Sequence, residues 1–335
     1  MSASSLVIKI QQFQRIFNLY ASNTIFVLGI FGNIVNILVF TRLKLFRGNR
    51  CAFYLTVESI VNIYLICLVE VLILVSDIAQ INLANTSVIW CKLQTTLGQP
   101  ARLFIGSIIC FEALDQYLST HYRLHLRQLS TFALAQISII AVSFVWILQS
   151  IPYIIFYDIV PSFGCIITNQ SLVYYYSYVY YIFLNGLLPI CTASVFSLLA
   201  YRNVRHIIRR QLAIERRRLD RQMTAMIFAR VIMFVVLSLP YTIFRIYLLN
   251  LNGLVIGTIH NAINQLVTVL VNALLSCNFS LSFYVFVTIS SRFRRQVRQL
   301  LLRQCWRSMK RCLHLDLNSV RPIGVISDTS DWQSQ

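Results

Sequence analysis

Seven long apolar stretches constrain the fold of this 335-residue chain more than any other feature of its sequence. The stretches cover about 20–41, 52–76, 93–119, 131–157, 174–201, 223–249 and 258–290. The interior of a lipid bilayer offers a backbone no hydrogen-bond partner, so a single segment that crosses it must be a helix of about 20 residues. The sequence therefore predicts an all-α integral membrane protein built as a bundle of seven membrane-spanning helices.

Composition and charge support this class. Hydrophobic residues make up 57% of the chain and charged residues only 12%, compared with roughly 45–50% and about 25% in ordinary soluble domains. An ordinary soluble globular fold is therefore excluded. The formal net charge is +18, but the basic residues are divided among short segments instead of lying on one soluble face. Anionic membrane lipid is thus an expected partner, and nucleic acid is not.

The placement of lysine and arginine predicts the orientation of the helices. Four segments hold most of these residues: 42–51, 120–130, 202–222 and 291–335. They contain 23 of the 29 basic residues, whereas the N-terminal segment and the alternate set of loops contain three. Basic short loops stay on the cytoplasmic side during insertion. We expect an extracellular N-terminus at 1–19, a helical domain at 20–304 and a cytoplasmic tail at 305–335.

The last part of the helical domain has a pattern of its own. Residues 291–304 combine regularly spaced apolar residues with several arginines. This pattern predicts a short amphipathic eighth helix that lies in the inner membrane interface.

Several short motifs stand at fixed distances along this framework. Gln116 follows Cys91 by 25 residues and precedes Trp146 by 30 residues. Gly32-Asn33 lies in the first apolar stretch, and the fifth and sixth each contain a proline. This series resembles the landmarks of the rhodopsin-like (class A) seven-helix receptors, which couple to heterotrimeric G proteins. The resemblance covers about residues 20–304, and the similarity is closest to peptide receptors.

The outer side of such a receptor carries a disulfide, which the resemblance places between Cys91 and Cys165. The bond would hold the 158–173 loop over a ligand cavity, because the exterior is oxidising. Two free thiols are the alternative. The same resemblance implies a polar core at Asn33 and Asn62, and Asn62 takes the place of the aspartate with which the family binds sodium.

Four residues are expected to contact the ligand: Gln99, Arg102, Tyr241 and Arg245. An ionisable residue at membrane depth is by default functional, because burying it without a partner is costly. Candidate partners of Arg102 are Glu70, Glu112 or an acidic group on the ligand. The many tyrosines around the expected cavity favour a peptide ligand of the neuropeptide type, although tyrosines also occupy membrane interfaces.

The switch motifs of the family are altered. The residues in its switch and coupling positions are Asp115, Gln116, Tyr117, Leu124, Asp220, Phe234, Pro240 and Phe286. Gln116 replaces the arginine of the family triplet, so we expect its neutral amide to bridge Asp115 and Asp220 by hydrogen bonds that are weaker than those of an arginine. Phe286 replaces a tyrosine of the 258–290 helix, and a register shifted by two residues would place Tyr284 there instead.

Covalent modification is expected on both sides of the membrane. Asn85 and Asn169 begin glycosylation sequons in outer loops. Cys305 and Cys312 lie in the basic segment after the last span, where palmitoylation would attach the tail to the bilayer.

These features together predict a cell-surface receptor at the plasma membrane that binds an extracellular ligand. It would activate a heterotrimeric G protein through movement of the 223–249 helix. The alternative is a multi-pass transporter or channel subunit, although the sequence has neither the two similar halves nor the matched broken helices of many transporters. We expect no enzyme, metal site or cofactor, because the five histidines are scattered over loops and helix ends.

Overall fold

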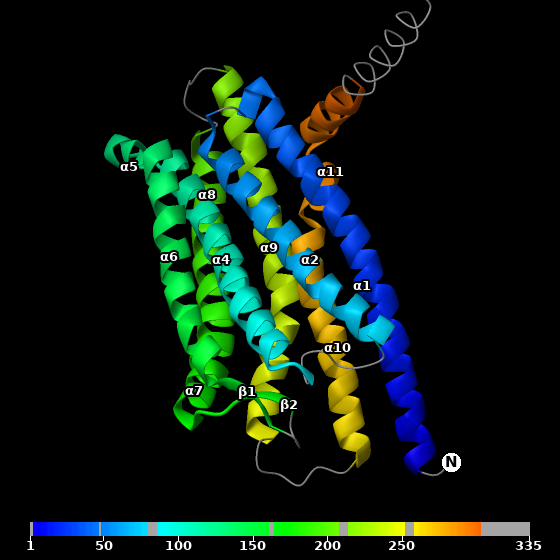
Figure 1. Cartoon of the computed structure of the whole chain (residues 1–335). Helices are drawn as coiled ribbons and strands as arrows, with labels where there is room; N and C mark the ends of the chain where they lie inside the picture. The colour runs from blue at the N-terminus through cyan, green and yellow to red at the C-terminus, as the bar shows by residue number, and fades with distance from the viewer. Residues whose placement is uncertain are drawn as a thin grey trace, which may run out of the picture.

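The computed structural model describes residues 3–46, 48–79, 86–160, 164–207, 214–251 and 258–302 and shows one bundle of long helices (Figure 1). Seven helices are long and apolar enough to cross a membrane: Ser4–Arg42, Arg50–Val69, Val88–Thr120, Phe132–Phe156, Gln170–Arg205, Arg221–Leu248 and Ile259–Ser280. The prediction of seven apolar spanning helices is confirmed at this level, and the architecture is that of a multi-pass membrane protein.

The helices and strands follow one another along the chain with short connections. They are α1 (Ala3–Arg42), η1 (Lys44–Phe46), α2 (Arg50–Ala79), α4 (Val88–Thr120), α5 (Leu124–Leu129), α6 (Phe132–Phe156), β1 (Tyr157–Val160), β2 (Gly164–Ile167), α7 (Gln170–Tyr174), η2 (Tyr175–Leu187), α8 (Leu188–Ile207), α9 (Ile214–Leu251), α10 (Thr258–Ser280) and α11 (Ser282–Ile289). Helical residues continue over 291–302.

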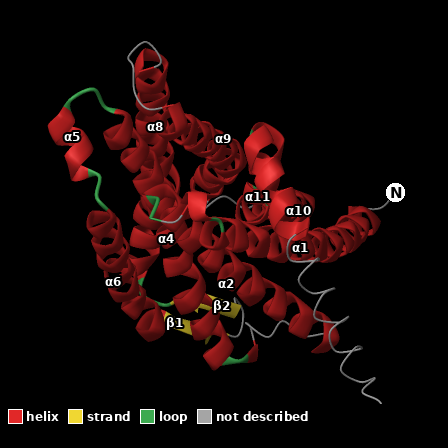
Figure 2. Ribbon diagram, turned by 90° about the horizontal axis from the view of Figure 1, so that it is seen from above, coloured by secondary structure: helices red, strands yellow, loops and turns green. Residues whose placement is uncertain are grey.

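Helix α4 forms the centre of the bundle. It packs against α2, α6, α8 and α9, while α1 packs against α2 and α10. Viewed along the bundle, α4 lies inside, and α6 and α1 lie on opposite sides (Figure 2). We call the end that carries β1 and β2 the hairpin end, and the opposite end, which carries α5, the α5 end (Figure 1).

The outer surface of the bundle is apolar, as a lipid-facing surface must be. On α6, Ile137, Ile140 and Phe144 are each more than 60% exposed. On α4, by contrast, Ile105 and Ile109 are buried in the main core. A soluble monomer rarely exposes a continuous apolar surface of this extent, so the distribution of apolar residues agrees with the membrane class.

The structure differs from the predicted boundaries at the N-terminus. We expected 1–19 as a short segment before the first helix, but α1 begins at Ala3 and runs to Arg42. Hydropathy identifies only the part of a helix that can lie in lipid, whereas the helix itself continues wherever its residues favour it.

A small hairpin is the one departure from an all-α fold among the described residues. Strands β1 and β2 pair antiparallel, and Ile159 lies opposite Cys165. The hairpin covers one end of the bundle and contacts α4.

The predicted helix at 174–201 has an unusual first half. After the short α7, residues of η2 form a π-helix of 13 residues, and α8 then continues as a regular α-helix. A π-helix uses i→i+5 hydrogen bonds and occurs mostly as single turns at functional sites. Here it places several tyrosines on the side of α9.

The predicted helix at 258–290 is broken at Leu281 between α10 and α11. No proline causes the break. Polar contacts with α1 hold the chain here, because Ser280 Oγ donates to the Ile25 carbonyl at 3.0 Å and Asn36 Nδ2 donates to Ser282 Oγ at 3.2 Å. Beyond α11, Phe293, Val297 and Leu300 are buried on one face of the 291–302 helix. Its location in a membrane interface stays a prediction.

Candidate functional site

The hairpin is fixed to the centre of the bundle by a disulfide. Cys91, near the start of α4, bonds to Cys165 of β2, with a Cα–Cα distance of 5.6 Å. The expected pairing is therefore present. Tyr153 and Tyr157 pack beside it, and burial raises the pKa of the Tyr157 phenol.

Four tyrosines pack against one another in the hairpin half of the bundle, and we call them the tyrosine cage: Tyr176, Tyr180 and Tyr181 of η2 and Tyr241 of α9. The rings of Tyr176 and Tyr180 are stacked with centroids 4.9 Å apart. The rings of Tyr181 and Tyr241 have centroids 6.0 Å apart. The Tyr176 and Tyr181 hydroxyls lie 2.8 Å from each other. These contacts join η2 to α9.

The predicted ligand residues meet at this cage. Gln99 of α4 donates from Nε2 to the Tyr176 hydroxyl, and its backbone carbonyl accepts from the Tyr180 hydroxyl at 3.2 Å. Arg245 of α9 donates from Nε to the Tyr241 hydroxyl at 3.2 Å. Its guanidinium carbon lies 4.2 Å from the centre of the Tyr181 ring, which is cation–π distance.

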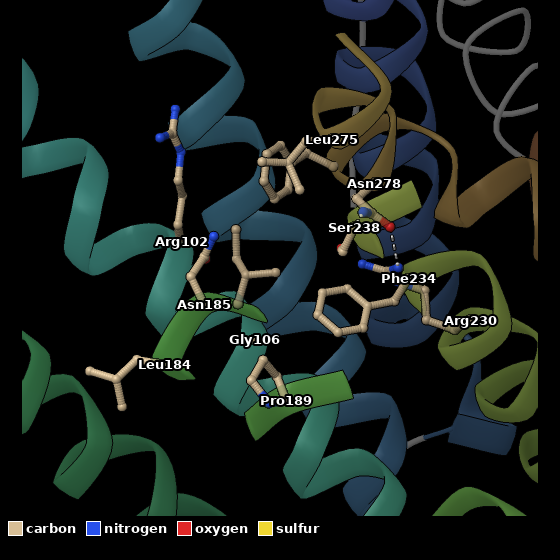
Figure 3. A pocket seen from close by; sticks show the side chains of 12 residues that line it. Arg102, Gly106, Leu184, Asn185, Pro189, Arg230, Phe234, Ser238, Leu275 and Asn278 are labelled. Carbon is tan, nitrogen blue, oxygen red and sulfur yellow. Dashed lines mark hydrogen bonds between the residues drawn. The ribbon is translucent and has the colours of Figure 1, made fainter. Parts of the chain in front are cut away.

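Arg102 lies one turn further along α4 and has a different environment. Its Nε is buried and has no hydrogen-bond partner. Its side chain lines a cavity of about 20 Å³ in the middle of the bundle. Figure 3 shows this cavity between α4, the η2–α8 segment, α9 and α10. Asn185, Ser238 and Asn278 contribute polar groups to its wall.

An ion pair lies at the far side of the same cavity. Arg230 of α9 donates from Nε at 2.9 Å and from Nη2 at 2.5 Å to one carboxylate oxygen of Glu58 on α2. Arg230 also contacts Asn278 Oδ1 at 3.4 Å, which Figure 3 marks, and Asn278 Nδ2 donates to Ser238 Oγ at 3.0 Å. Arg230 is 0% exposed and Glu58 is 1% exposed. This pair connects α2, α9 and α10 in the dry interior.

Glu112 of α4 adds a second carboxylate to this region. It is fully buried, both of its oxygens lack a hydrogen-bond partner, and it interacts electrostatically with Glu58 and Arg230. Glu112 is therefore part of the Glu58–Arg230 region. It forms no described ion pair with Arg102, for which it was a candidate partner.

Sequence analysis singled out Arg102 and Arg245 but missed Glu58 and Arg230. A signal was available, because both residues are charged and lie inside apolar stretches, where a charge is by default functional.

Asp115, the acid of the Asp115-Gln116-Tyr117 triplet, lies at the α5 end and has several partners. Asp115 accepts from Arg50 Nε at 3.1 Å, from Cys51 Sγ at 3.3 Å and from Ser130 Oγ. Arg50 and Cys51 belong to α2, and Ser130 follows α5. Asp115 thus ties α4 to α2 and to the end of α5.

Gln116 makes contacts other than those expected. Its Nε2 donates to Cys51 Sγ, and its Oε1 accepts from Thr224 Oγ1 of α9 at 2.7 Å. The predicted bridge between Asp115 and Asp220 is wrong for Asp115, because that carboxylate already binds Arg50. The side chain of Asp220 lies outside the described residues. The amide nevertheless links α4 to α9, as a latch would.

The other predicted switch residues lie in the core, in α4, in α9 and on α5. Phe234 is buried in the main core and lines the cavity, and Pro240 lies inside α9. Tyr117 packs against Phe196 with ring centroids 5.6 Å apart. Leu124, the first residue of α5, is 64% exposed.

Phe286 and Tyr284, the two residues considered for one family position, have different surroundings in α11. Phe286 is 0% exposed and packs against Phe293 with centroids 5.9 Å apart. Tyr284 instead directs its hydroxyl to the Leu28 carbonyl of α1 at 3.2 Å. Phe286 is the residue that faces the core.

The predicted polar core is assembled between α1, α2 and α10. Asn33 Nδ2 donates to the carbonyls of Gly29 and Phe279, each at 2.8 Å, and Asn62 Nδ2 reaches Asn33 Oδ1 at 3.3 Å. Both amides are buried.

The modification sites are mostly outside the structural description. Asn85, Cys305 and Cys312 lie beyond the described residues, so their modification stays a prediction. Asn169 caps α7, and its Oδ1 accepts from the Leu172 backbone at 3.1 Å.

No protein-family model matches the chain, and no curated protein is significantly similar to it in sequence. Its function must therefore be inferred from the fold and from the contacts between its helices.

Proposed function

We propose that the chain is a receptor of the rhodopsin-like class, located in the plasma membrane with the hairpin end outside. It binds a peptide-type extracellular ligand near the tyrosine cage and activates a heterotrimeric G protein at the α5 end. The first support is the arrangement of the hairpin end. A disulfide holds a hairpin beside a cluster of tyrosines, glutamine and arginine, and aromatic rings with polar tips suit peptide recognition.

The observation that carries the proposal is the attachment of α9. Thr224 binds Gln116 of α4, and one and a half turns further along, Arg230 binds Glu58 of α2. Both contacts are buried. Two specific polar contacts hold α9 in one defined position, which would be the inactive state. Breaking these contacts would allow α9 to move to a second position, and a signalling element requires two such states. Outward movement of α9 would open the α5 end to a G protein.

The α5 end has the character of a docking surface for such a partner. Leu124 presents an exposed apolar side chain, and Arg123 and Arg127 flank it in sequence. The positive-inside rule alone explains the arginines, so Leu124 carries the coupling role in this proposal.

Weakening the α9 attachment tests the proposed function. In cells that express the full chain, Thr224→Val removes the hydrogen bond to Gln116 and keeps the side-chain shape. Loss of one neutral hydrogen bond is worth about 0.5–1.5 kcal/mol, so ligand-independent calcium or cyclic-nucleotide signalling should rise about two- to tenfold. The matched control is Thr268→Val, because Thr268 Oγ1 donates at 2.7 Å only within its own helix, to the Asn264 carbonyl.

The control variant should signal like the native chain at equal surface expression. If Thr224→Val and Glu58→Gln both reach the surface and neither changes basal signalling in either readout, the receptor proposal is wrong. A transporter would then be the better explanation.

A further inference from the structure

In the hairpin half of the bundle, Arg102 and Arg245 form no ion pair among the side chains that the structure describes, and the side chain of Glu70, a candidate partner of Arg102, lies outside that description. Among side chains that the structure describes, the ion pairs are Arg50–Asp115 and Arg230–Glu58, and neither involves Arg102 or Arg245. Glu112 lies ten residues beyond Arg102 on α4, which is about 15 Å along a helix. It is therefore too far along the helix to neutralise Arg102.

The groups around these arginines are mainly hydrogen-bond donors. Arg102 has a buried Nε without an acceptor. Arg245 is held by the Tyr241 hydroxyl and lies over the Tyr181 ring, so it keeps its charge without a carboxylate. Tyrosine hydroxyls can donate to a charged acceptor as well. Both arginines interact electrostatically with the same tyrosines, Tyr181 and Tyr241 among them, and this concentration of positive charge and hydroxyl groups attracts an anion.

The cavity beside Arg102 limits the size of the group that enters it. A volume of about 20 Å³ accommodates roughly one water-sized group. One oxygen of a carboxylate at the tip of a ligand has this size, and the rest of the ligand would lie toward the tyrosine cage.

We propose that the ligand carries a carboxylate, which Arg102 binds in the bidentate manner typical of arginine, with Arg245 adding a second positive charge. This inference specifies the ligand class of the receptor proposed above and depends on that proposal for its signalling role. It depends on the geometry alone for binding. A free peptide C-terminus and a small aromatic acid share the required chemistry.

The position of the site also suggests how binding reaches α9. Arg102 and Arg230 line the same cavity. An anion held there competes with Glu58 for the positive charge of Arg230, because electrostatic interactions are strong where water is excluded. Competition would loosen the Arg230–Glu58 pair and favour movement of α9.

Binding can be measured with two matched probe pairs on the purified full chain in detergent. One pair is 3-phenylpropionate and 3-phenylpropionamide, and the other is the dipeptide glycyl-phenylalanine and its C-terminal amide. Each carboxylate that binds should raise the melting temperature in a saturable way, and its amide should not. The pair that responds identifies the small acid or the peptide terminus as the better source of the carboxylate.

Variants then locate the site. Arg102→Gln should raise the half-saturating concentration at least about tenfold, because it removes charge-assisted hydrogen bonds. Lys92→Gln, which removes a positive charge elsewhere on α4, should leave it unchanged. Equal shifts with acid and amide, no saturable shift with either acid, or full binding by Arg102→Gln would each overturn the proposal.

A measurement without any probe keeps the proposal testable if a variant binds nothing. Arg102→Met should raise the melting temperature of the ligand-free protein by several degrees, because it removes a buried charge that has no carboxylate partner among the described side chains. A lower melting temperature would reveal an internal ion pair and overturn the proposal. Neither measurement uses a G protein, so failure here is distinguishable from failure of the receptor function.

Discussion

The buried Glu58–Arg230 pair allows a quantitative test of what holds α9 in place. Glu58→Gln keeps the size of the side chain and removes its charge, so the two Arg230 hydrogen bonds at 2.9 and 2.5 Å would end on a neutral amide oxygen instead of a carboxylate. Removing one partner of a buried ion pair typically costs about 3–5 kcal/mol. Glu112 is close enough to interact with Arg230 and compensates in part, so we expect a loss near the lower limit, about 3 kcal/mol.

A double-mutant cycle separates the pair from its surroundings. Glu58→Gln, Arg230→Gln and the double variant should give a coupling energy of about 2–3 kcal/mol, because the double variant retains no unpaired charge from this pair. Adding Glu112→Gln to Glu58→Gln should increase the loss toward 5 kcal/mol, since Arg230 then has no nearby carboxylate.

Unfolding of the purified chain in detergent can be followed by far-ultraviolet circular dichroism, which measures the loss of helix and does not depend on the exposed thiol of Cys191. A loss of about 3 kcal/mol corresponds to a melting temperature lower by roughly 5 °C or more. Suppose that the losses of stability in the two single variants add up, within about 0.5 kcal/mol, to the loss in the double variant. That result would show that Glu58 and Arg230 do not interact, and the assigned attachment of α9 would be refuted.

Two further substitutions test the frame around the site. Cys165→Ser opens a loop of 74 residues that the disulfide to Cys91 closes, so it should cost up to about 4 kcal/mol; a reductant should lower the melting temperature of the native chain equally and have no effect on the variant. Gly186→Ala would place a Cβ 2.7 Å from Thr242 Cγ2, whereas Gly98→Ala meets nothing closer than 3.8 Å. Gly186→Ala should lower the melting temperature by several degrees, because overpacking costs about 1–3 kcal/mol. Equal melting temperatures of the two alanine variants would contradict the packing of η2 against α9.

The seven helices could be predicted because each needs only a long apolar window. Their ends could not, since polar residues such as Lys9 and Arg15 are compatible with helix but not with lipid, and α1 includes both. The break at Leu281 was also invisible in sequence. It occurs without proline and is associated with contacts to α1, which only the packed bundle provides.

The candidate site was predictable where a residue's role depends on its own type. The family resemblance indicated the disulfide, and the charge of the arginines within apolar stretches indicated ligand residues; the structure brings Gln99, Tyr241 and Arg245 to one cage. Partners were not predictable. Glu58 and Arg230 are 172 residues apart in sequence, and whether they meet depends on the rotation and tilt of two helices. The partner of Gln116 depends on the same geometry.

The π-helix has a consequence for comparing this chain with others. Each i→i+5 turn contains one more residue than an α-helical turn of the same path. A homologue that lacks one residue between Tyr175 and Leu187 could convert one turn of this segment to a regular α-helical turn and leave α8 in place. Sequence alignments that forbid gaps inside helices would then misplace Pro189 and all landmarks beyond it, so distant homologues will be found most readily when such a gap is permitted.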